Sequence, residues 1–207
     1  MTTLTMRAAG AAVLMAVTLT GCAAQTDNPR TSAPTGGTSA PARDSNAEAQ
    51  QFLADYDLEG KGTVEIIDEL DRLGGPERPQ DLMASVRPDE LIVSAGDDEL
   101  SLGIPDDLFY LSVAPYIDQT HDCFNHSLTT CQGELASTEV QVQIVDRAGN
   151  DVLVDETRTT FENGFTGFWL PRNIEGTLRI TSDGRSAEAD FTTHPDAPTC
   201  LTTMHLV

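Results

Sequence analysis

Hydrophobic positions follow a helical period in the first folded part of the chain, from residue 46 to residue 87. Apolar residues recur at positions i, i+1, i+4 and i+7, which lie on one helix face: Ile66, Ile67, Leu70 and Leu73. Thr63 is the predicted N-cap of this helix, and Gly74 follows its last turn. A shorter apolar stripe at 52–58 predicts a helix before it, and a third short helix is expected at 79–84. Helices this short are unstable alone, so they must pack on the rest of the chain or on a second subunit.

From residue 88 onward the period changes to two, which is typical of half-buried strands. The pairs Gly96-Asp97 and Asp183-Gly184 are typical of hairpin turns. The predicted strands cover 91–93, 99–102, 109–113, 140–145, 152–154, 167–171, 177–181, 187–193 and 200–207. Many short strands between regular turns predict an antiparallel sandwich of the immunoglobulin type, although the cysteine pair around a tryptophan is absent. The predicted fold class is therefore α+β, with a short N-terminal helical section (46–87) followed by an antiparallel β-sandwich-like domain (88–207).

The first 45 residues have the pattern of an export signal and a tether. Residues 1–21 carry one charge, Arg7, and then an apolar stretch too short to span a bilayer. They end in Leu19-Thr20-Gly21-Cys22, which resembles a bacterial lipobox and implies cleavage before Cys22 and lipid attachment to it. The alternative is an ordinary secretory signal with an incidental cysteine. Residues 22–45 are rich in Ser, Thr, Pro, Gly and Ala, so they are expected to form a flexible tether. We therefore expect an extracytoplasmic lipoprotein, anchored to the outer face of the cell membrane through Cys22.

Composition excludes some functions but selects none. The 207 residues include 33 Asp and Glu against 12 Lys and Arg, a formal net charge of −21. Nucleic-acid binding requires clustered cations, so no nucleic-acid partner is expected. An apolar fraction of 39% is enough for a core but not for a multi-pass membrane protein. The acidic surface raises the local cation concentration, but carboxylates alone do not select a soft metal ion.

The candidate chemistry lies in one short segment. With Cys22 assigned to lipid, three thiols remain: Cys123, Cys131 and Cys200. Two of them fall with His121 and His126 inside eleven residues that have no strand periodicity, and loops commonly carry sites. Thiolate and imidazole together suit Cu(I) and Zn(II). The spacing matches neither a zinc finger nor a zinc protease.

A structural disulfide is the alternative to a metal site. Three cysteines allow three different single bridges, and the sequence does not choose among them. Cys200 closes the longest loop with either partner, which favours a bridge to it. A bridge leaves the third thiol, with His121 and His126, free to bind copper. Met204 falls on the same strand face as Cys200, but a core position is the better interpretation of it.

Several long runs resemble the CueP family of copper-binding proteins. They are 109–116, 121–123, 126–135, 164–172 and 197–203, with a further similarity in the helical part at 78–88. The resemblance extends from Phe52 to the C-terminus. It implies an extracytoplasmic protein of copper tolerance, a helical part that can dimerise, and Cys123, Cys131 and Cys200 as sulfur ligands with His121 and His126 nearby. The lipobox departs from the soluble periplasmic members of the family.

The functional hypothesis is a lipoprotein that sequesters or delivers copper through this Cys/His site. Thiolates hold Cu(I), and imidazoles accept Cu(II). Cysteine reduces Cu(II), so the site thiols can reduce the captured ion, but no other catalytic activity is expected. The alternatives are a thiol–disulfide redox protein, against which no Cys-x2-Cys motif appears, and a structural β-sandwich with one disulfide.

Overall fold

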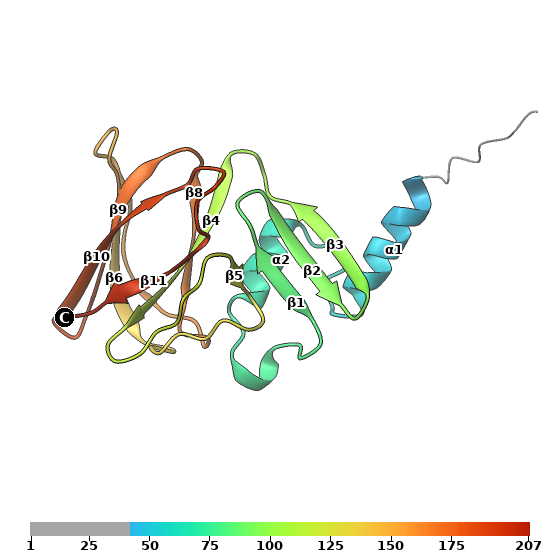
Figure 1. Cartoon of the computed structure of the whole chain (residues 1–207), viewed down its shortest axis with the longest axis horizontal. Helices are drawn as coiled ribbons and strands as arrows, with labels where there is room; N and C mark the ends of the chain where they lie inside the picture. Colours follow the sequence, from blue (N-terminus) through green and yellow to red (C-terminus); the bar gives the residue numbers. More distant parts are fainter. Residues whose placement is uncertain (1–41) are drawn as a thin grey trace, which may run out of the picture. The chain divides into compact units, whose positions relative to one another are not determined.

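A computed structural model describes residues 42–207, with side chains from residue 47 (Figure 1). The predicted signal peptide, Cys22 and most of the tether lie outside the described residues. The helices are α1 (Ala42–Ala54), α2 (Thr63–Leu70) and the 3-10 helix η1 (Gly75–Glu77). The strands are β1 (Met83–Val86), β2 (Glu90–Ala95), β3 (Asp98–Gly103), β4 (Leu108–Tyr116), β5 (His126–Ser127), β6 (Glu139–Asp146), β7 (Val152–Thr159), β8 (Thr166–Pro171), β9 (Glu175–Ser182), β10 (Arg185–Thr192) and β11 (Cys200–His205). No helix in this part of the chain is long and apolar enough to cross a membrane.

Helix α2 packs its apolar face on a small sheet with strand order β3-β2-β1-β5. Ile66, Ile67 and Leu70 are buried and share a core with Val86 of β1 and residues of β2. The expected second helix is confirmed, but its N-cap is Gly62 rather than Thr63, because the Glu65 carboxylate accepts the Gly62 N–H at 2.8 Å. Packing within one chain therefore stabilises this short helix.

The prediction of a third helix at 79–84 is wrong. The chain forms η1 before that segment and then enters β1, which pairs with β2 and places Val86 opposite His126 of β5. Neither β1, with four residues, nor β5, with two, is long enough to show a period of two. Strand β1 pairs with β2 across a short turn, whereas β5 pairs with β1 from a distant part of the chain. The segment around His126, interpreted as a loop, therefore contains a strand that the sequence pattern does not reveal.

The predicted sandwich is formed by two sheets, β10-β9-β6-β7 and β11-β4-β8. Their facing side chains make one core, in which Met204 is fully buried as expected. The pairs are antiparallel except that β11 runs parallel to β4, a departure from the all-antiparallel expectation. Strand β4 is buried on both faces: Phe109, Leu111 and Val113 face the sandwich core, and Tyr110 faces the α2 core. The α+β fold class is confirmed.

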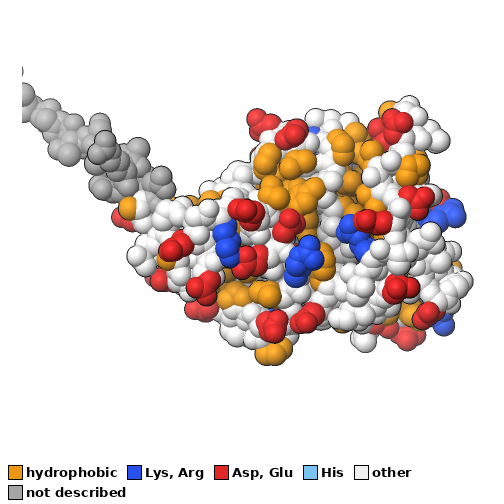
Figure 2. Space-filling view, turned by 180° about the vertical axis from the view of Figure 1, so that it is seen from behind, with side chains coloured by type: hydrophobic (Ala, Val, Ile, Leu, Met, Phe, Trp, Pro, Cys, Tyr) orange, Lys and Arg blue, Asp and Glu red, His pale blue; other side chains and the backbone are white. Residues whose placement is uncertain are grey.

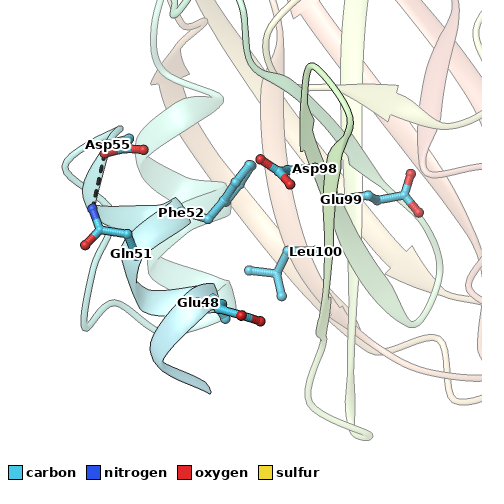
Figure 3. A pocket seen from close by; sticks show the side chains of 8 residues that line it. Glu48, Gln51, Phe52, Asp55, Asp98, Glu99 and Leu100 are labelled. Carbon is cyan, nitrogen blue, oxygen red and sulfur yellow. Dashed lines mark hydrogen bonds between the residues drawn. The ribbon is translucent and has the colours of Figure 1, made fainter. Parts of the chain in front are cut away.

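The acidic composition is visible on the surface. Red carboxylates outnumber blue cations on the face drawn in Figure 2. A hollow of about 690 Å³ between α1 and β3 is lined by carboxylates and by Phe52, which points from the helix toward the strand (Figure 3). No Lys or Arg is among its lining residues. Its charged oxygens are hard ligands, so this hollow does not have the chemistry of a copper site.

A close contact at Gly167 fixes the Tyr110 ring between β8 and the α2 core. A Cβ built on Gly167 would lie 1.8 Å from the Tyr110 hydroxyl oxygen. The Tyr110 ring cannot retreat, because it is 1% exposed and packs against Trp169 with a centroid distance of 4.7 Å. Only glycine at position 167 leaves room for that ring.

We predict that Gly167→Ala lowers the free energy of unfolding by about 1–3 kcal/mol, because the methyl group overpacks this contact. Urea titration followed by tryptophan fluorescence measures the change. The matched control is Gly103→Ala in β3, where a Cβ meets nothing within 4 Å, and its expected change is within about 0.5 kcal/mol. Equal losses in the two variants would contradict the prediction.

Candidate metal centre

Four of the five predicted site residues come together in the folded chain. The ligand atoms of Cys123, His126, Cys131 and Cys200 all lie within 4.8 Å of one another. Cys123 and Cys200 form a disulfide with a Cα–Cα distance of 5.6 Å, and Cys131 is a free thiol. The Cys131 sulfur lies 3.6 Å from that of Cys123, and the Cys200 sulfur lies 3.7 Å from Nδ1 of His126. The structure thus has one of the three bridges that the sequence left open.

The cluster forms where β5 and β11 meet. The His126 backbone N–H donates to the Thr199 hydroxyl at 3.0 Å, and that hydroxyl donates to the Val86 carbonyl at 2.7 Å. The Phe124 carbonyl accepts N–H bonds from Thr199 and Cys200 at 2.9 and 3.2 Å. These bonds hold the segment of Cys123 and His126 against the first residue of β11. Residues more than 70 positions apart are therefore brought together by backbone pairing, independently of the disulfide.

His126 is a buried imidazole held between a carboxylate and the sulfurs. Its Nε2 bonds Oδ1 of Asp71 at 2.7 Å, so Nδ1 is the atom that faces Cys200. Both side chains have no exposed surface. Metal-binding histidines typically use their second nitrogen in this way, which fixes the orientation of the ring. His126 therefore has the arrangement of a metal ligand with an outer carboxylate.

Asp71 is in turn held by several donors. Tyr110 and Ser112 of β4 donate hydroxyl bonds to its Oδ2 at 2.6 and 3.2 Å. The Asn163 amide donates to its Oδ1 at 2.9 Å and also bonds the Asp71 carbonyl. A buried carboxylate is stable only when its oxygens are bonded and its charge is balanced. Asp71 satisfies both conditions, with His126 as its cationic partner.

The pKa values of Asp71, His126 and Cys131 are shifted because these three groups contact one another in or near the interior. Burial raises the pKa of Asp71, but the charge and hydrogen bond of His126 hold it below its usual value. Burial lowers the pKa of His126, but Asp71 outweighs that and raises it to about 9. Burial raises the pKa of the Cys131 thiol, but the hydrogen bond and charge of His126 lower it to about 7. At neutral pH the resting state is an Asp71 carboxylate and an imidazolium, and the Cys131 thiol is partly ionised.

His121 and Arg78 lie at the margin of the cluster. His121 is outside the set of ligand atoms within 4.8 Å, but its ring is close enough to lower the pKa of Cys131 further. Its Nε2 is buried and has no hydrogen-bond partner in the described part of the chain. Arg78 is buried, donates to the Leu73 carbonyl at 2.9 Å, and has its pKa lowered by burial against the charges of Asp71 and Cys131.

Asp71, Tyr110 and Asn163 were not predicted as site residues. Asp71 stands in an acidic helix end, where a solvated carboxylate is the ordinary interpretation. It meets His126 across 55 positions and Asn163 across 92 positions. No local sequence pattern marks these three residues. The close approach of the Gly133 and Gly164 backbones, where a Cβ on Gly133 would be 2.6 Å from the Gly164 carbonyl oxygen, appears only in the fold.

A partly buried group of thiol and imidazole ligands beside a β-sandwich is typical of proteins that bind soft metal ions. Comparisons with known proteins narrow this class. The model of a family described as "Periplasmic copper-binding protein CueP" matches residues 65–205, so the chain belongs to the CueP family. The solved structure titled "Crystal Structure of S.CueP" is 41% identical, with a TM-score of 0.73, and covers 77% of this chain and 97% of its own. No curated protein matches.

We predict that alkylation of Cys131 by iodoacetamide follows pH with a midpoint near 7, because the imidazolium of His126 favours the thiolate. The disulfide form of a Cys22→Ser chain isolates this thiol, and mass spectrometry measures the rate. In Asp71→Asn the carboxylate that keeps His126 charged is lost. The pKa of His126 then falls, and the Cys131 midpoint rises by at least about one pH unit.

The urea-unfolded protein is the control, in which the midpoint should lie near the ordinary thiol value of 9.0. If the Asp71→Asn profile superimposes on that of the parent, Asp71 does not act on the thiol through His126.

Proposed function

We propose that this chain is an extracytoplasmic copper-binding protein whose ligands are Cys123, Cys131, Cys200 and His126, with His121 as an accessory ligand. The observation that carries the proposal is the convergence of three sulfurs and Nδ1 of His126 within 4.8 Å in a chain of the CueP family. The family description names a periplasmic copper-binding protein, which supports both the metal and the compartment. The ligand set is soft, and soft thiolates select Cu(I) over hard cations.

The redox state of the cluster determines how many thiolates it offers. With the Cys123–Cys200 bridge intact, Cys131 and the imidazoles remain as ligands. Reduction of the bridge adds two thiolates within reach of the same centre. We propose that the reduced form holds Cu(I) for sequestration or delivery, and that the bridged form holds copper weakly. The unpartnered Nε2 of His121 is a donor that a copper ion near Cys131 would satisfy.

The thiol–disulfide alternative is part of the same chemistry. Two thiolates, Cys123 and Cys200, can give one electron each to two Cu(II) ions, which yields two Cu(I) ions and the Cys123–Cys200 bond. No atom is lost in this step, and Cys131 keeps its thiolate. The observation that favours it is the bridge itself beside a free thiol at 3.6 Å. On this proposal, reduction of Cu(II) stops after one turnover unless an external thiol reduces the bridge.

We predict that the reduced Cys22→Ser chain binds Cu(I) at least about 100-fold more tightly than its Cys131→Ser variant, because one of three thiolates is lost. Asp71→Asn should weaken binding by about 10- to 100-fold, as removal of an outer carboxylate does. Competition with a coloured Cu(I) chelator measures both affinities.

Met204→Leu is the matched control, because it removes a buried sulfur from the sandwich core and not from the cluster. Its affinity should equal that of the parent. If Cys131→Ser and the triple Cys123/Cys131/Cys200→Ser variant bind as tightly as the parent, the cysteines are not the ligands and the bridge is purely structural.

We further propose that the chain is a lipoprotein anchored to the outer face of the cell membrane through Cys22, and that its helical section can form a homodimer. The lipobox before Cys22 supports the anchor. In this arrangement residues 22–45 would let the copper-binding domain reach partners near the membrane.

We predict that the wild-type protein sediments with the membranes of a bacterial host, and that Cys22→Ala moves it to the soluble fraction. In this prediction the lipid on Cys22 supplies the membrane attachment. Immunoblotting of the fractions measures the distribution, and Cys131→Ala is the control that should stay with the membranes. A Cys22→Ala protein that still sediments would rule out the anchor.

A further inference from the structure

The loop that carries His121 and Cys123 begins at an unusual carboxylate contact. After β4 ends at Tyr116, three successive backbone N–H groups point at the side chain of Glu134. Ile117 donates to Oε2 at 2.7 Å, Asp118 donates to both oxygens at 3.0 and 3.3 Å, and Gln119 donates to Oε2 at 3.3 Å. Consecutive N–H groups of this kind form a concave anion site. Here the anion is supplied by the protein itself.

Glu134 stands on a segment that is fixed independently of this loop. It follows Cys131 by three positions. The Cys131 N–H donates to the Ser127 carbonyl at 3.1 Å, and the Gly133 N–H donates to the Asn163 carbonyl at 2.7 Å. The contact of Gly133 with the Gly164 backbone leaves no room for the segment to shift inward. The backbone at Glu134 is therefore held in place, and its side chain binds the start of the loop that carries Cys123.

The remaining contacts of the loop show where Glu134 is needed. The Thr120 hydroxyl donates to the Thr202 carbonyl at 2.8 Å, and His205 Nε2 bonds the Ile117 carbonyl at 3.1 Å. These bonds tie the loop to β11, the strand of Cys200. Glu134 alone among these contacts ties it to the segment of Cys131. Further along, the Phe124 carbonyl accepts N–H bonds from Thr199 and Cys200. The Cys123–Cys200 bridge also holds the loop covalently, and that covalent link alone disappears when the bridge is reduced.

We infer that Glu134 is a positioning residue, which holds the loop of Cys123 beside Cys131 when the Cys123–Cys200 bridge is open. Together with the Phe124 carbonyl bonds to β11, this anchor keeps Cys123 near the other two sulfurs in the reduced protein, both for closing the bridge and for binding Cu(I). The part of the inference that concerns Cu(I) binding, here called the copper half, rests on the proposed function. The part that concerns bridge formation does not. Preorganised ligands bind more tightly because less freedom is lost on binding, and the same holds for bridge formation, where it raises the effective concentration of one thiol near the other.

Charge supports this role. Hydrogen bonds from Ile117 and Asp118 hold the pKa of Glu134 below its usual value, so the side chain is ionised at neutral pH. Bonds to an ionised acceptor are stronger than neutral ones. The Gln side chain has the same shape but one acceptor oxygen and no charge, so Glu134→Gln should keep part of the anchor, and Glu134→Ala should keep none.

The experiment equilibrates the full Cys22→Ser chain with glutathione redox buffers and measures the fraction bridged by thiol trapping and mass spectrometry. Glu134→Ala should lower the equilibrium constant for bridge formation by about tenfold, comparable to the loss of one net hydrogen bond to a charged group, and Glu134→Gln by less. The matched control is Glu139→Ala, which removes an exposed carboxylate from β6 with the same change of charge. A merely structural effect would lower the urea midpoint of the bridged form without this graded change in the bridge equilibrium.

Cu(I) affinity of the same reduced proteins is the second measurement, and Glu134→Ala should weaken it by about tenfold relative to Glu139→Ala. If the bridge equilibrium of Glu134→Ala equals that of Glu139→Ala, the inference is overturned. If the bridge equilibrium falls and Cu(I) affinity does not, the copper half is overturned and the anchor remains. A parent protein that binds no Cu(I), yet shows the graded bridge equilibrium, would overturn the proposed function and leave Glu134 as an anchor for the disulfide.

Discussion

The buried ion pair between Asp71 and His126 is the interaction on which the rest of the cluster depends. It joins the end of α2 to the two-residue strand β5, and neither side chain has any exposed surface. Breaking such a pair leaves an uncompensated charge in the interior, which destabilises a protein by about 3–5 kcal/mol. The pair is tolerated because Tyr110, Ser112 and Asn163 satisfy the carboxylate. The same ion pair and hydrogen bonds therefore stabilise the fold and orient the His126 imidazole in the cluster.

Strand β4 is the structural reason that these donors converge. Its alternate residues face opposite sides, so Phe109, Leu111 and Val113 build the sandwich core while Tyr110 and Ser112 point at Asp71. The same strand pairs in parallel with β11, with Cys200 opposite Ser112. One strand therefore positions the outer carboxylate through its side chains and a site cysteine through its backbone. A change of register by one residue would exchange the two faces and remove both.

The sequence predicted the long elements well, because period and turn chemistry are local. All nine strands with clear alternation and the amphipathic helix α2 are present, and the Gly96-Asp97 pair joins β2 to β3 as expected. The elements that it missed have no local periodic pattern. Strands β1 and β5 are too short to carry a period, and the segment at 79–84 forms no helix because β1 is completed by β2 and β5. For the cluster, donor type and clustering pointed to the four converging side chains, but nothing local distinguishes Asp71 from its solvated neighbours.

The geometry also couples the redox state of the sulfurs to metal binding on the proposed function. Copper that binds the three-thiolate form and not the bridged form must shift the bridge equilibrium toward the reduced state, by RT ln(1 + [L]/Kd). An oxidant that closes the bridge must weaken copper binding by the same free energy. In the bridged form the hydrogen bond and charge of His126 lower the pKa of Cys131 to about 7 and so favour its thiolate. Closing the bridge therefore removes two sulfurs from the ligand set, while Cys131 and the His126 imidazole stay in place. The Asp71–His126 pair is what makes that arrangement independent of the bridge, since it orients the imidazole from the opposite side of the ring.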